Sequence, residues 1–306
     1  MALGYDGKLF ILAFDHRGSF KKKFDVGSDA TPEQMEQLKD AKFLVFEGFQ
    51  RAADKAGVPK DQLGVLVDEE MGTAVAREAP SAGVKLAMPV EKSGQDVFDF
   101  EFGDEFGQHI EDFNPDFSKV LVRWNPGDDP DDKKTQAQRL SKLGAWLHET
   151  GRKFLFELLV PANESDLARV EGDQERYDLE VRPDLTLRAI REIRDLGVEP
   201  DIWKIEGLDK REDCEALAKL IRDGGRDGVI AVVLGRGADD ARVDHWLKTG
   251  APVEGYQGFA IGRSIWAKPM EAFFSGEMSR EEAAEKIGES FARFIEVYNG
   301  AEGDAS

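Results

Sequence analysis

Lys204 lies in a short apolar stretch whose alternating residues indicate a buried β-strand. In the run Asp201-Ile-Trp-Lys-Ile-Glu206, a period of two places Lys204 on one face and the bulky Trp203 and Ile205 on the other. The bulky face suits packing against helices, so we expect Lys204 to point into the interior of the fold. Burial lowers the pKa of a lysine and leaves part of it as the free amine, the nucleophile that forms an imine (Schiff base) with a ketone.

A second charged residue, Glu157, lies in a run of the same kind. In Lys153-Phe-Leu-Phe-Glu-Leu-Leu159 the same alternation gives Glu157 a face shared with two leucines. If the two runs form neighbouring strands, this carboxylate lies near Lys204, where it can move protons as bonds to carbon form and break. The alternative is that Lys204 is a structural lysine, salt-bridged to Glu157 or Glu206.

Eight apolar runs rich in Val, Ile, Leu and Phe alternate along the chain with longer amphipathic stretches. Runs that are hydrophobic on both faces are typical of buried parallel strands. Eight strands, each followed by a helix, predict an α/β fold of the (β/α)8 type, a TIM barrel, with an open Rossmann-type sheet as the alternative. The runs are Lys8–Asp15, Gly64–Asp68, Val84–Val90, Lys119–Trp124, Lys153–Val160, Asp201–Glu206, Val229–Leu234 and Gly258–Gly262.

Nearly every run ends in a charged residue, and the carboxyl ends of the strands form the active site of a TIM barrel. We expect Arg123 to orient an oxygen anion or hydroxyl of a substrate, and Asp15 to bind hydroxyls or hold a cation in place. Asp68, Glu91 and Lys92 are further candidates for substrate binding, although residues just past a strand can also be solvated loop residues.

Two glycine–arginine pairs follow the last two runs, in Leu234-Gly-Arg-Gly237 and Ile261-Gly-Arg-Ser264. TIM barrels frequently bind phosphate at this place, because glycines expose backbone N–H groups and helix N-termini favour anions. A dinucleotide site is disfavoured, because the third glycine is missing and Asp239-Asp240 would repel a pyrophosphate. The expected phosphate ligands are Gly235, Arg236, Gly237, Gly262 and Arg263.

The connections between the runs complete the expected organisation. Thr31-Pro32-Glu33-Gln34 predicts a capped helix start, and a last helix is expected from Ser279 to about Tyr298. Two long connections, residues 91–117 and 161–183, are either lids or surface excursions. We expect one barrel domain over residues 1–300 and a disordered tail over 301–306.

Composition limits the classes of partner. The 306 residues carry a formal net charge of −20, which argues against binding to nucleic acid or to an anionic membrane surface. Cys214 is the only cysteine and is expected in the core. With a single cysteine no internal disulfide can form, so a reducing cytoplasm is the expected location. The four histidines, His16, His109, His148 and His245, show no metal-binding spacing, so no metal is expected.

Six motifs together resemble the aldolase-like domain that is often fused behind 5-dehydro-2-deoxygluconokinase in inositol catabolism. The resemblance runs from about Lys8 to about Tyr298, without the kinase domain. More distantly, the layout is similar to tagatose-1,6-bisphosphate aldolase and sulfofructose-phosphate aldolase. The motifs are Leu12-Ala-Phe-Asp-His-Arg-Gly18, Pro89-Val-Glu-Lys-Ser-Gly94, Val120-Leu-Val-Arg-Trp-Asn-Pro126, Asp201-Ile-Trp-Lys-Ile-Glu-Gly-Leu-Asp209, Val233-Leu-Gly-Arg-Gly-Ala238 and Gly258-Phe-Ala-Ile-Gly-Arg263.

The resemblance implies a Schiff-base aldolase without a cofactor, in which Lys204 forms the imine, Glu157 and Asp15 are catalytic, and Gly262 and Arg263 bind phosphate. It implies cleavage of 6-phospho-5-dehydro-2-deoxygluconate to dihydroxyacetone phosphate and malonic semialdehyde, with a sulfo-sugar phosphate as the nearest rival. Tagatose-bisphosphate aldolases carry a lysine on strand four, whereas this chain has Arg123, which puts tagatose bisphosphate in doubt.

Two further alternatives remain open from the sequence. The barrel could be a sugar-phosphate isomerase or decarboxylase in which Lys204 donates a proton without forming an imine. It could also be a non-catalytic barrel that binds a sugar phosphate. Homo-oligomers are common among barrels of this kind, but the sequence identifies no surface patch for one.

Overall fold

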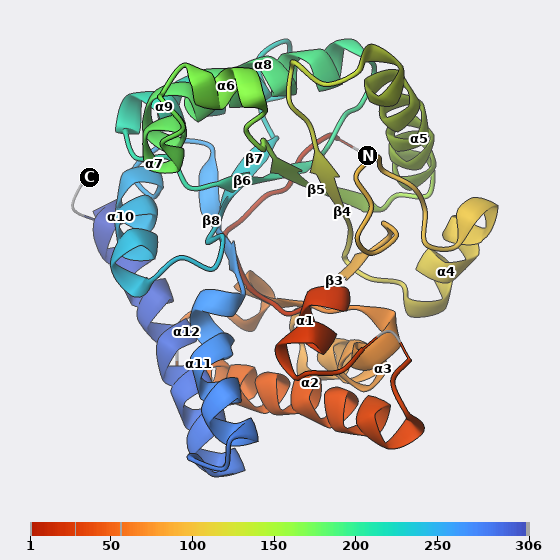
Figure 1. The fold of residues 1–306 in the computed structure, drawn as a ribbon, viewed down its shortest axis with the longest axis vertical. Coiled ribbons are helices and arrows are strands. Elements are labelled where there is room, and N and C mark those ends of the chain that lie inside the picture. Colours follow the sequence, from red (N-terminus) through yellow and green to blue (C-terminus); the bar gives the residue numbers. More distant parts are fainter. Residues whose placement is uncertain (1, 28, 56, 304–306) are drawn as a thin grey trace.

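The computed structural model describes residues 2–27, 29–55 and 57–303. Eight parallel strands pair in sequential order, and β8 pairs with β1, so the sheet closes into a barrel (Figure 1). The predicted TIM barrel is therefore confirmed, and each strand begins and ends within two residues of its predicted run. The strands are β1 (Leu9–Ala13), β2 (Leu63–Leu66), β3 (Lys85–Pro89), β4 (Phe117–Arg123), β5 (Lys153–Leu159), β6 (Ile202–Glu206), β7 (Ile230–Leu234) and β8 (Tyr256–Ile261).

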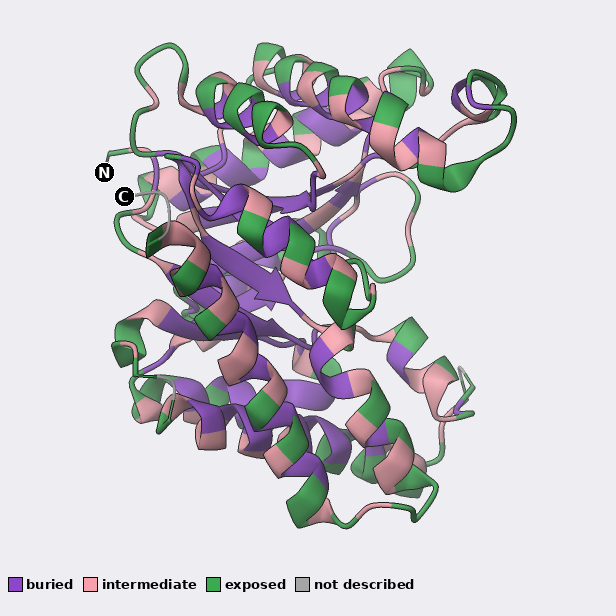
Figure 2. Ribbon diagram, turned by 90° about the vertical axis from the view of Figure 1, so that its left-hand side faces the viewer, coloured by how far each residue is buried: buried purple, intermediate pink, exposed green. Residues whose placement is uncertain are grey.

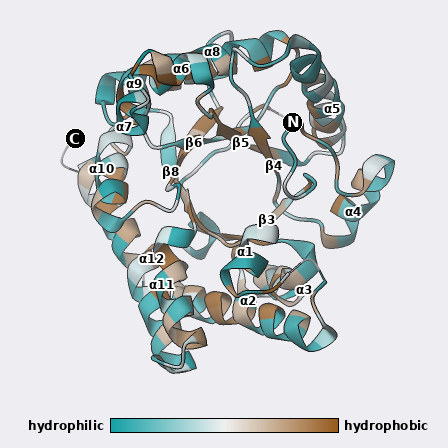
Figure 3. Ribbon diagram, viewed as in Figure 1, coloured by the Kyte–Doolittle hydropathy of each residue, from teal (hydrophilic) through white to brown (hydrophobic). Residues whose placement is uncertain are grey.

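The strands are buried on both faces, as the continuous apolar runs predict (Figure 2). Inward-facing side chains such as Ile11, Leu155 and Val232 form one cluster inside the barrel. The alternate side chains, Trp203 among them, belong to a much larger cluster between the barrel and its helices. Hydrophobic residues, brown in Figure 3, are frequent along the strands of the barrel, so polar side chains that point inward are conspicuous.

Helices surround the barrel, and several begin at the expected signals. The helix α2 follows Thr31, whose hydroxyl accepts from the backbone N–H of Gln34 while the Gln34 side chain accepts from the N–H of Thr31. The helices are α1 (Gly18–Lys23), α2 (Pro32–Ala53), α3 (Glu69–Glu78), α4 (Phe106–Phe113), α5 (Pro130–Glu149), α6 (Glu164–Ala168), α7 (Gln174–Arg176), α8 (Arg182–Asp195), α9 (Arg211–Arg222), α10 (Asp240–Gly250), α11 (Arg263–Phe274) and α12 (Arg280–Gly303), with shorter 3-10 turns at Lys60–Gln62, Ala79–Ala82 and Gly103–Glu105.

The final helix, α12, is longer than expected. It continues through Gly303, so residues 301–303 of the expected tail are helical, and residues 304–306 lie outside the described part of the chain. Along the described residues, no helix combines the length and the apolar composition needed to cross a membrane.

The two long connections are both partly folded. The first contains α4 and a short antiparallel bridge between Glu91 and Phe100. The second contains α6, α7 and a π-helical turn over Tyr177–Val181. Tyr177 is buried and its hydroxyl donates to the carbonyl of Val160 at 2.8 Å, which attaches this segment to the end of β5.

Candidate active site

A cavity of about 820 Å³ opens at the carboxyl ends of the strands. Strand ends on most sides of the barrel form its wall, together with residues 91–95 and residues from the second long connection such as Gln174 and Tyr177. With the exception of Asp68, all the site residues predicted from the sequence line this cavity. The carboxyl ends of the strands therefore bring the predicted charges together, as they do in other TIM barrels.

Lys204 and Glu157 are opposite each other in the pairing of β5 with β6. Both side chains point into the barrel, where Lys204 is 2% and Glu157 is 6% exposed. Glu157 Oε2 lies 3.0 Å from Lys204 Nζ. The amine and the carboxylate are thus close enough to exchange a proton with each other or with a bound molecule that contacts both.

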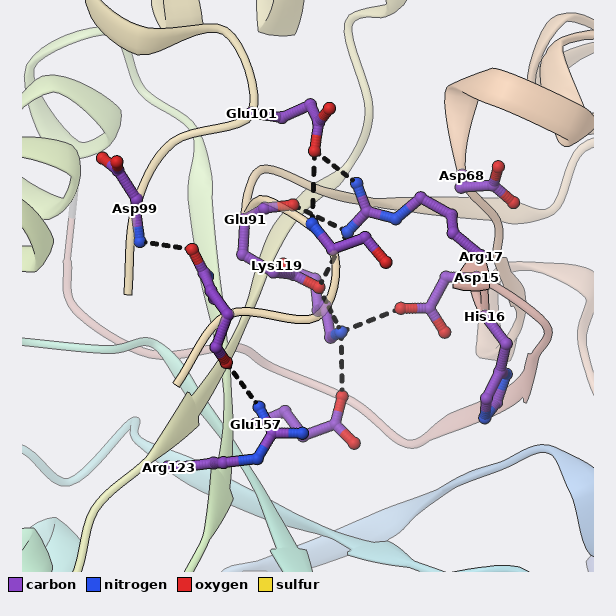
Figure 4. A network of polar contacts seen from close by, with 12 residues as sticks. Asp15, His16, Arg17, Asp68, Glu91, Asp99, Glu101, Lys119, Arg123 and Glu157 are labelled. Carbon is purple, nitrogen blue, oxygen red and sulfur yellow. Dashed lines mark hydrogen bonds and ion pairs between the residues drawn. The ribbon is translucent and has the colours of Figure 1, made fainter. Parts of the chain in front are cut away.

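A second lysine, Lys119 on β4, lies inside the same cavity and was not predicted from the sequence. Its ammonium contacts three carboxylates, at 2.8 Å from Asp15, 2.8 Å from Glu91 and 3.0 Å from Glu157 (Figure 4). Lys119 therefore links strand one, the end of strand three and strand five in one polar network. Glu157 is shared between Lys119 and Lys204.

The pattern of the sequence contained a signal for Lys119. Lys119 and Arg123 are four residues apart on β4, so the alternation of side chains along a strand places both on the inner face. The run predicted from the sequence starts at Lys119, at the amino end of the expected strand. In the structure β4 begins at Phe117, and because the strands of a barrel are inclined and staggered, a lysine in mid-strand reaches Asp15 beyond the end of β1.

The charges of this network set the protonation of its members. Burial disfavours the ammonium of Lys119, but Asp15, Glu157 and Glu91 outweigh burial and raise its pKa above the usual range. Burial also opposes ionisation of Asp15 and Glu157, but Lys119 and Lys204 lower the pKa of both carboxyls. Lys119 is therefore a permanent cation and a poor nucleophile. Lys204 forms an ion pair with one carboxylate, that of Glu157, whereas Lys119 contacts three. Lys204 is therefore the better candidate for the attacking amine.

Glu91 differs from the other two carboxylates. Burial raises its pKa, against the opposing effects of Lys119 and Arg17. One of its oxygens, Oε2, is buried and has no hydrogen-bond partner among the described residues. Arg17 donates to the backbone carbonyl of Glu91 at 2.7 Å, which fixes the residue at the edge of the cavity. Glu91 is thus the member of the network that most readily holds a proton.

The two glycine–arginine pairs lie side by side at the ends of β7 and β8. Arg263 is the first residue of α11, and it donates to the backbone carbonyl of Arg236 at 3.1 Å. Gly237 has a φ of 75°, which favours glycine. A Cβ on Gly262 would lie 2.3 Å from the carbonyl oxygen of Ala13, so the backbone packs too closely there for any side chain.

The two arginines have different surroundings. Arg236 contacts Asp178 at 2.8 Å and Glu206 at 3.1 Å, so two carboxylates balance its charge. Arg263 has no carboxylate partner within the described ranges. The sequence did not predict this difference between the two arginines, because Asp178 lies in the second long connection, far from Arg236 along the chain. Arg263, at the N-terminus of a helix of 12 residues, is the stronger candidate for an anion ligand.

Arg123 and Lys92 line the other side of the cavity. Arg123 donates to the carbonyl of Gln95 at 2.8 Å, and like Arg263 it forms no ion pair with any described residue. Lys92 follows Glu91 in the same loop and is exposed. Both side chains are available to a negatively charged or hydroxylated ligand.

Asp68 does not reach the cavity, contrary to the expectation from the sequence. It is fully buried, where it pairs with Lys42 of α2 and accepts from the N–H of Met71 at 3.0 Å. The strand β2 ends early, at Leu66, so Asp68 becomes the N-cap of α3 instead of a residue of the barrel rim. This arrangement leaves Asp68 without access to a substrate.

Comparison with known proteins identifies the family. Residues 5–302 match a family described as an uncharacterized protein conserved in bacteria, DUF2090. The chain belongs to the DUF2090 family. No curated protein matches the sequence.

Solved structures similar to this DUF2090 chain share its fold. A fructose-bisphosphate aldolase from Plasmodium falciparum, solved with TRAP and a small-molecule inhibitor, is 14% identical with a TM-score of 0.67, over 96% of this chain and 91% of that chain. A Schiff base-forming fructose-1,6-bisphosphate aldolase is 16% identical with a TM-score of 0.57, over 94% of each chain. Cgl0159 from Corynebacterium glutamicum is 18% identical with a TM-score of 0.55, over 96% of this chain and 88% of that chain.

The histidines of this DUF2090 chain are dispersed. His16 lines the cavity, where burial lowers its pKa to about 4. His148 contacts Asp201, His245 contacts Asp209 and His109 contacts Glu69, each outside the cavity. In the part of the chain that the structure describes, no group of three or more His, Cys, Asp or Glu residues is arranged to hold a metal ion. The ammonium of Lys119 occupies the centre of the three carboxylates in the cavity.

Proposed function

We propose that this protein is a Schiff-base aldolase that cleaves a phosphorylated ketose, with Lys204 as the imine-forming residue. The observation that carries the proposal is the pair formed by Lys204 and Glu157 inside the barrel, next to the permanent cation Lys119. A buried amine beside a carboxylate is the arrangement that imine chemistry requires. The Schiff base-forming aldolase among the solved structures adds support through the shared fold.

The first steps follow from the positions of Lys204 and Glu157. The free amine of Lys204 attacks the carbonyl carbon of the ketose, and the carbonyl oxygen takes up a proton to give a carbinolamine. Glu157, 3.0 Å from the amine, first accepts the proton that the nitrogen loses and then donates one to the departing hydroxyl. Water leaves, and a protonated imine remains on Lys204.

The protonated imine then accepts the electrons of the breaking carbon–carbon bond. Glu157 or Asp15 takes the proton from the hydroxyl on the carbon that becomes the aldehyde, which is C4 in the numbering of a 2-ketose and C3 in 6-phospho-5-dehydro-2-deoxygluconate. The C3–C4 bond breaks, the aldehyde leaves and an enamine forms on Lys204. Protonation of the enamine carbon and hydrolysis of the imine release dihydroxyacetone phosphate and restore the amine. Lys119 keeps its charge throughout and stabilises the ionised carboxylates on either side of it.

The substrate phosphate is assigned to the ends of β7 and β8. Arg263 and the backbone N–H groups of Gly235, Gly237 and Gly262 form its binding site, with Arg236 as an additional ligand once it leaves Asp178 or Glu206. Arg123 binds an oxygen of the part of the ketose that becomes the aldehyde, because β4, which ends at Arg123, lies across the barrel from β8.

The proposed substrate is 6-phospho-5-dehydro-2-deoxygluconate, supported by the sequence motifs described above, with sulfofructose phosphate as the second candidate. Tagatose 1,6-bisphosphate returns to the set of substrates to be tested. The doubt rested on Arg123 standing in place of the family's lysine on strand four, and β4 also carries Lys119, which points into the cavity.

A panel of ketose phosphates tests the proposal when turnover is coupled to detection of dihydroxyacetone phosphate. We expect one member of the panel to be cleaved by the natural chain and by Lys142→Met, which changes an exposed lysine on α5. Lys204→Met should reduce that rate by at least about 1,000-fold, since covalent catalysis is lost. Equal rates for the natural chain and Lys204→Met would exclude the proposed mechanism.

A further inference from the structure

A third buried lysine, Lys42 on α2, lies outside the cavity and directly behind the end of β1. Its side chain is fully buried and pairs with the fully buried carboxylate of Asp68. The same ammonium donates to the backbone carbonyl of Phe14 at 2.7 Å and to that of His16 at 2.9 Å. These two carbonyls belong to the residues on either side of Asp15.

The contacts of Lys42 fix both peptide groups next to Asp15. Asp68 is itself held in place, because it accepts from the N–H of Met71 at the start of α3. The N–H of Phe14 donates to the backbone carbonyl of Leu66 at 2.8 Å, which connects the end of β1 to β2. The ammonium of Lys42 thus connects α2, the end of β1 and the start of α3 at one point.

A buried ion pair is a weak source of stability, because removing two charges from water offsets most of their attraction. Replacement of such a pair by uncharged groups of similar size is often neutral or stabilising. The distinctive effect of Lys42 and Asp68 is geometric. They hold a loop of three residues, Phe14 to His16, from the side opposite the cavity, while Asp15 contacts Lys119 from the cavity side at 2.8 Å.

We propose that Lys42 and Asp68 are a positioning pair that holds the carboxylate of Asp15 against Lys119. The placement of Asp15 is a property of the folded chain alone. Its effect on turnover rests on the proposed aldolase function. Two readouts therefore test these points separately. The first measures the placement of Asp15 without a ligand, and the second measures its effect on catalysis with dihydroxyacetone phosphate.

The test uses a double variant, Lys42→Met with Asp68→Asn, which removes both charges together and leaves an oxygen on residue 68 that can still cap α3. The matched control is Asp201→Asn. Asp201 is also fully buried and also accepts backbone N–H groups, but it lies at the opposite end of the barrel. Thermal unfolding of all variants establishes that they fold.

The first readout is the carboxyl ¹³C resonance of Asp15 in aspartate-labelled protein, assigned by its loss in Asp15→Asn. In the natural chain and in Asp201→Asn we expect no titration of this resonance above about pH 4, the ordinary value for aspartate. In the double variant the carboxylate moves away from Lys119, so its titration should shift upward by at least about one pH unit. An unchanged titration in the double variant, or the same shift in Asp201→Asn, would overturn the proposal.

The second readout is the exchange of the C3 protons of dihydroxyacetone phosphate with deuterated solvent, which reports the imine–enamine step. We expect the double variant to slow this exchange by about 30-fold, because a displacement of about 1 Å in a catalytic group can reduce rates by on the order of 100-fold. When residue 15 is already asparagine, adding Lys42→Met and Asp68→Asn should slow the exchange by less than about threefold. Equal reductions in both backgrounds would show that Lys42 does not act through Asp15. Absence of exchange in the natural chain would contradict the aldolase function, and the titration would still decide the placement.

Discussion

Lys119 and Asp15 are 104 residues apart in the sequence, and the ammonium of one lies 2.8 Å from the carboxylate of the other. This contact joins β4 to the end of β1 and makes Lys119 the centre of three carboxylates. It also assigns separate roles to the two buried lysines of the cavity. Lys119 holds charge, and Lys204 is left to react.

Removal of the ammonium of Lys119 should lower the stability of the fold. Lys119→Met leaves three buried carboxylates without their shared partner, and breaking a buried ion pair from one side costs about 3–5 kcal/mol. We expect the free energy of unfolding, measured in urea, to fall by that amount at pH 7. A change of less than about 1 kcal/mol would show that the three carboxylates do not depend on Lys119.

Glu157 should affect the chemical step more than binding. Glu157→Gln keeps the shape of the side chain and its place opposite Lys204 but removes its ability to accept a proton. We expect kcat to fall by about 100- to 10,000-fold with KM changed by less than about threefold. Steady-state kinetics on the cleaved ketose phosphate measures both. A rise in KM with kcat unchanged would assign Glu157 to binding instead.

The two arginines near the phosphate site should behave differently. Arg263→Ala removes a cation without a carboxylate partner in the described structure, so phosphate binding should weaken by about 10- to 100-fold, as for a hydrogen bond to a charged group. Arg236→Ala should instead lower the melting temperature, because Glu206 and Asp178 lose a partner. Inhibition by inorganic phosphate and thermal unfolding distinguish these effects. The reverse pattern would transfer the role of phosphate ligand to Arg236.

Asp201 should make the stability of the fold depend on pH. Burial opposes its ionisation, but hydrogen bonds from His148, the N–H of Phe154 and Lys153 outweigh burial and lower its pKa. A group with a lowered folded-state pKa contributes stability above its unfolded pKa of about 3.9, and the contribution is lost as the pH falls through the folded value. Asp201→Asn should therefore be less stable than the natural chain at pH 7 by about 1–3 kcal/mol. The difference should shrink below about pH 4. A difference that is constant from pH 7 to pH 3 would contradict this account.

Cys214 should be unreactive in the folded protein. It is buried in α9, and burial raises its pKa to about 12. Because the thiolate is the reactive form, iodoacetamide at pH 8 should label Cys214 only after unfolding. Mass spectrometry of the folded and urea-unfolded protein measures the difference. Rapid labelling of the folded chain would show that the thiol is accessible.

The barrel was predictable because every strand is buried on both faces and therefore reads as a continuous apolar run. Lys204 and Glu157 were predictable for a related reason, since a charge within such a run must point into the barrel. Asp68 was not, because β2 stops at Leu66 and the carboxylate turns to cap α3 and meet Lys42. The partners of Arg236 and Lys119 depend on contacts between residues far apart in the chain, and no local pattern encodes those contacts.

Reduction of the imine tests the central claim most directly. The natural chain is incubated with dihydroxyacetone phosphate and sodium borohydride, digested and examined by mass spectrometry for the peptide that carries the reduced adduct. We predict an adduct on Lys204, none on Lys119, and none anywhere in the cavity of Lys204→Met. An adduct on Lys119, or no adduct on the natural chain, would contradict the assignment of Lys204 as the nucleophile.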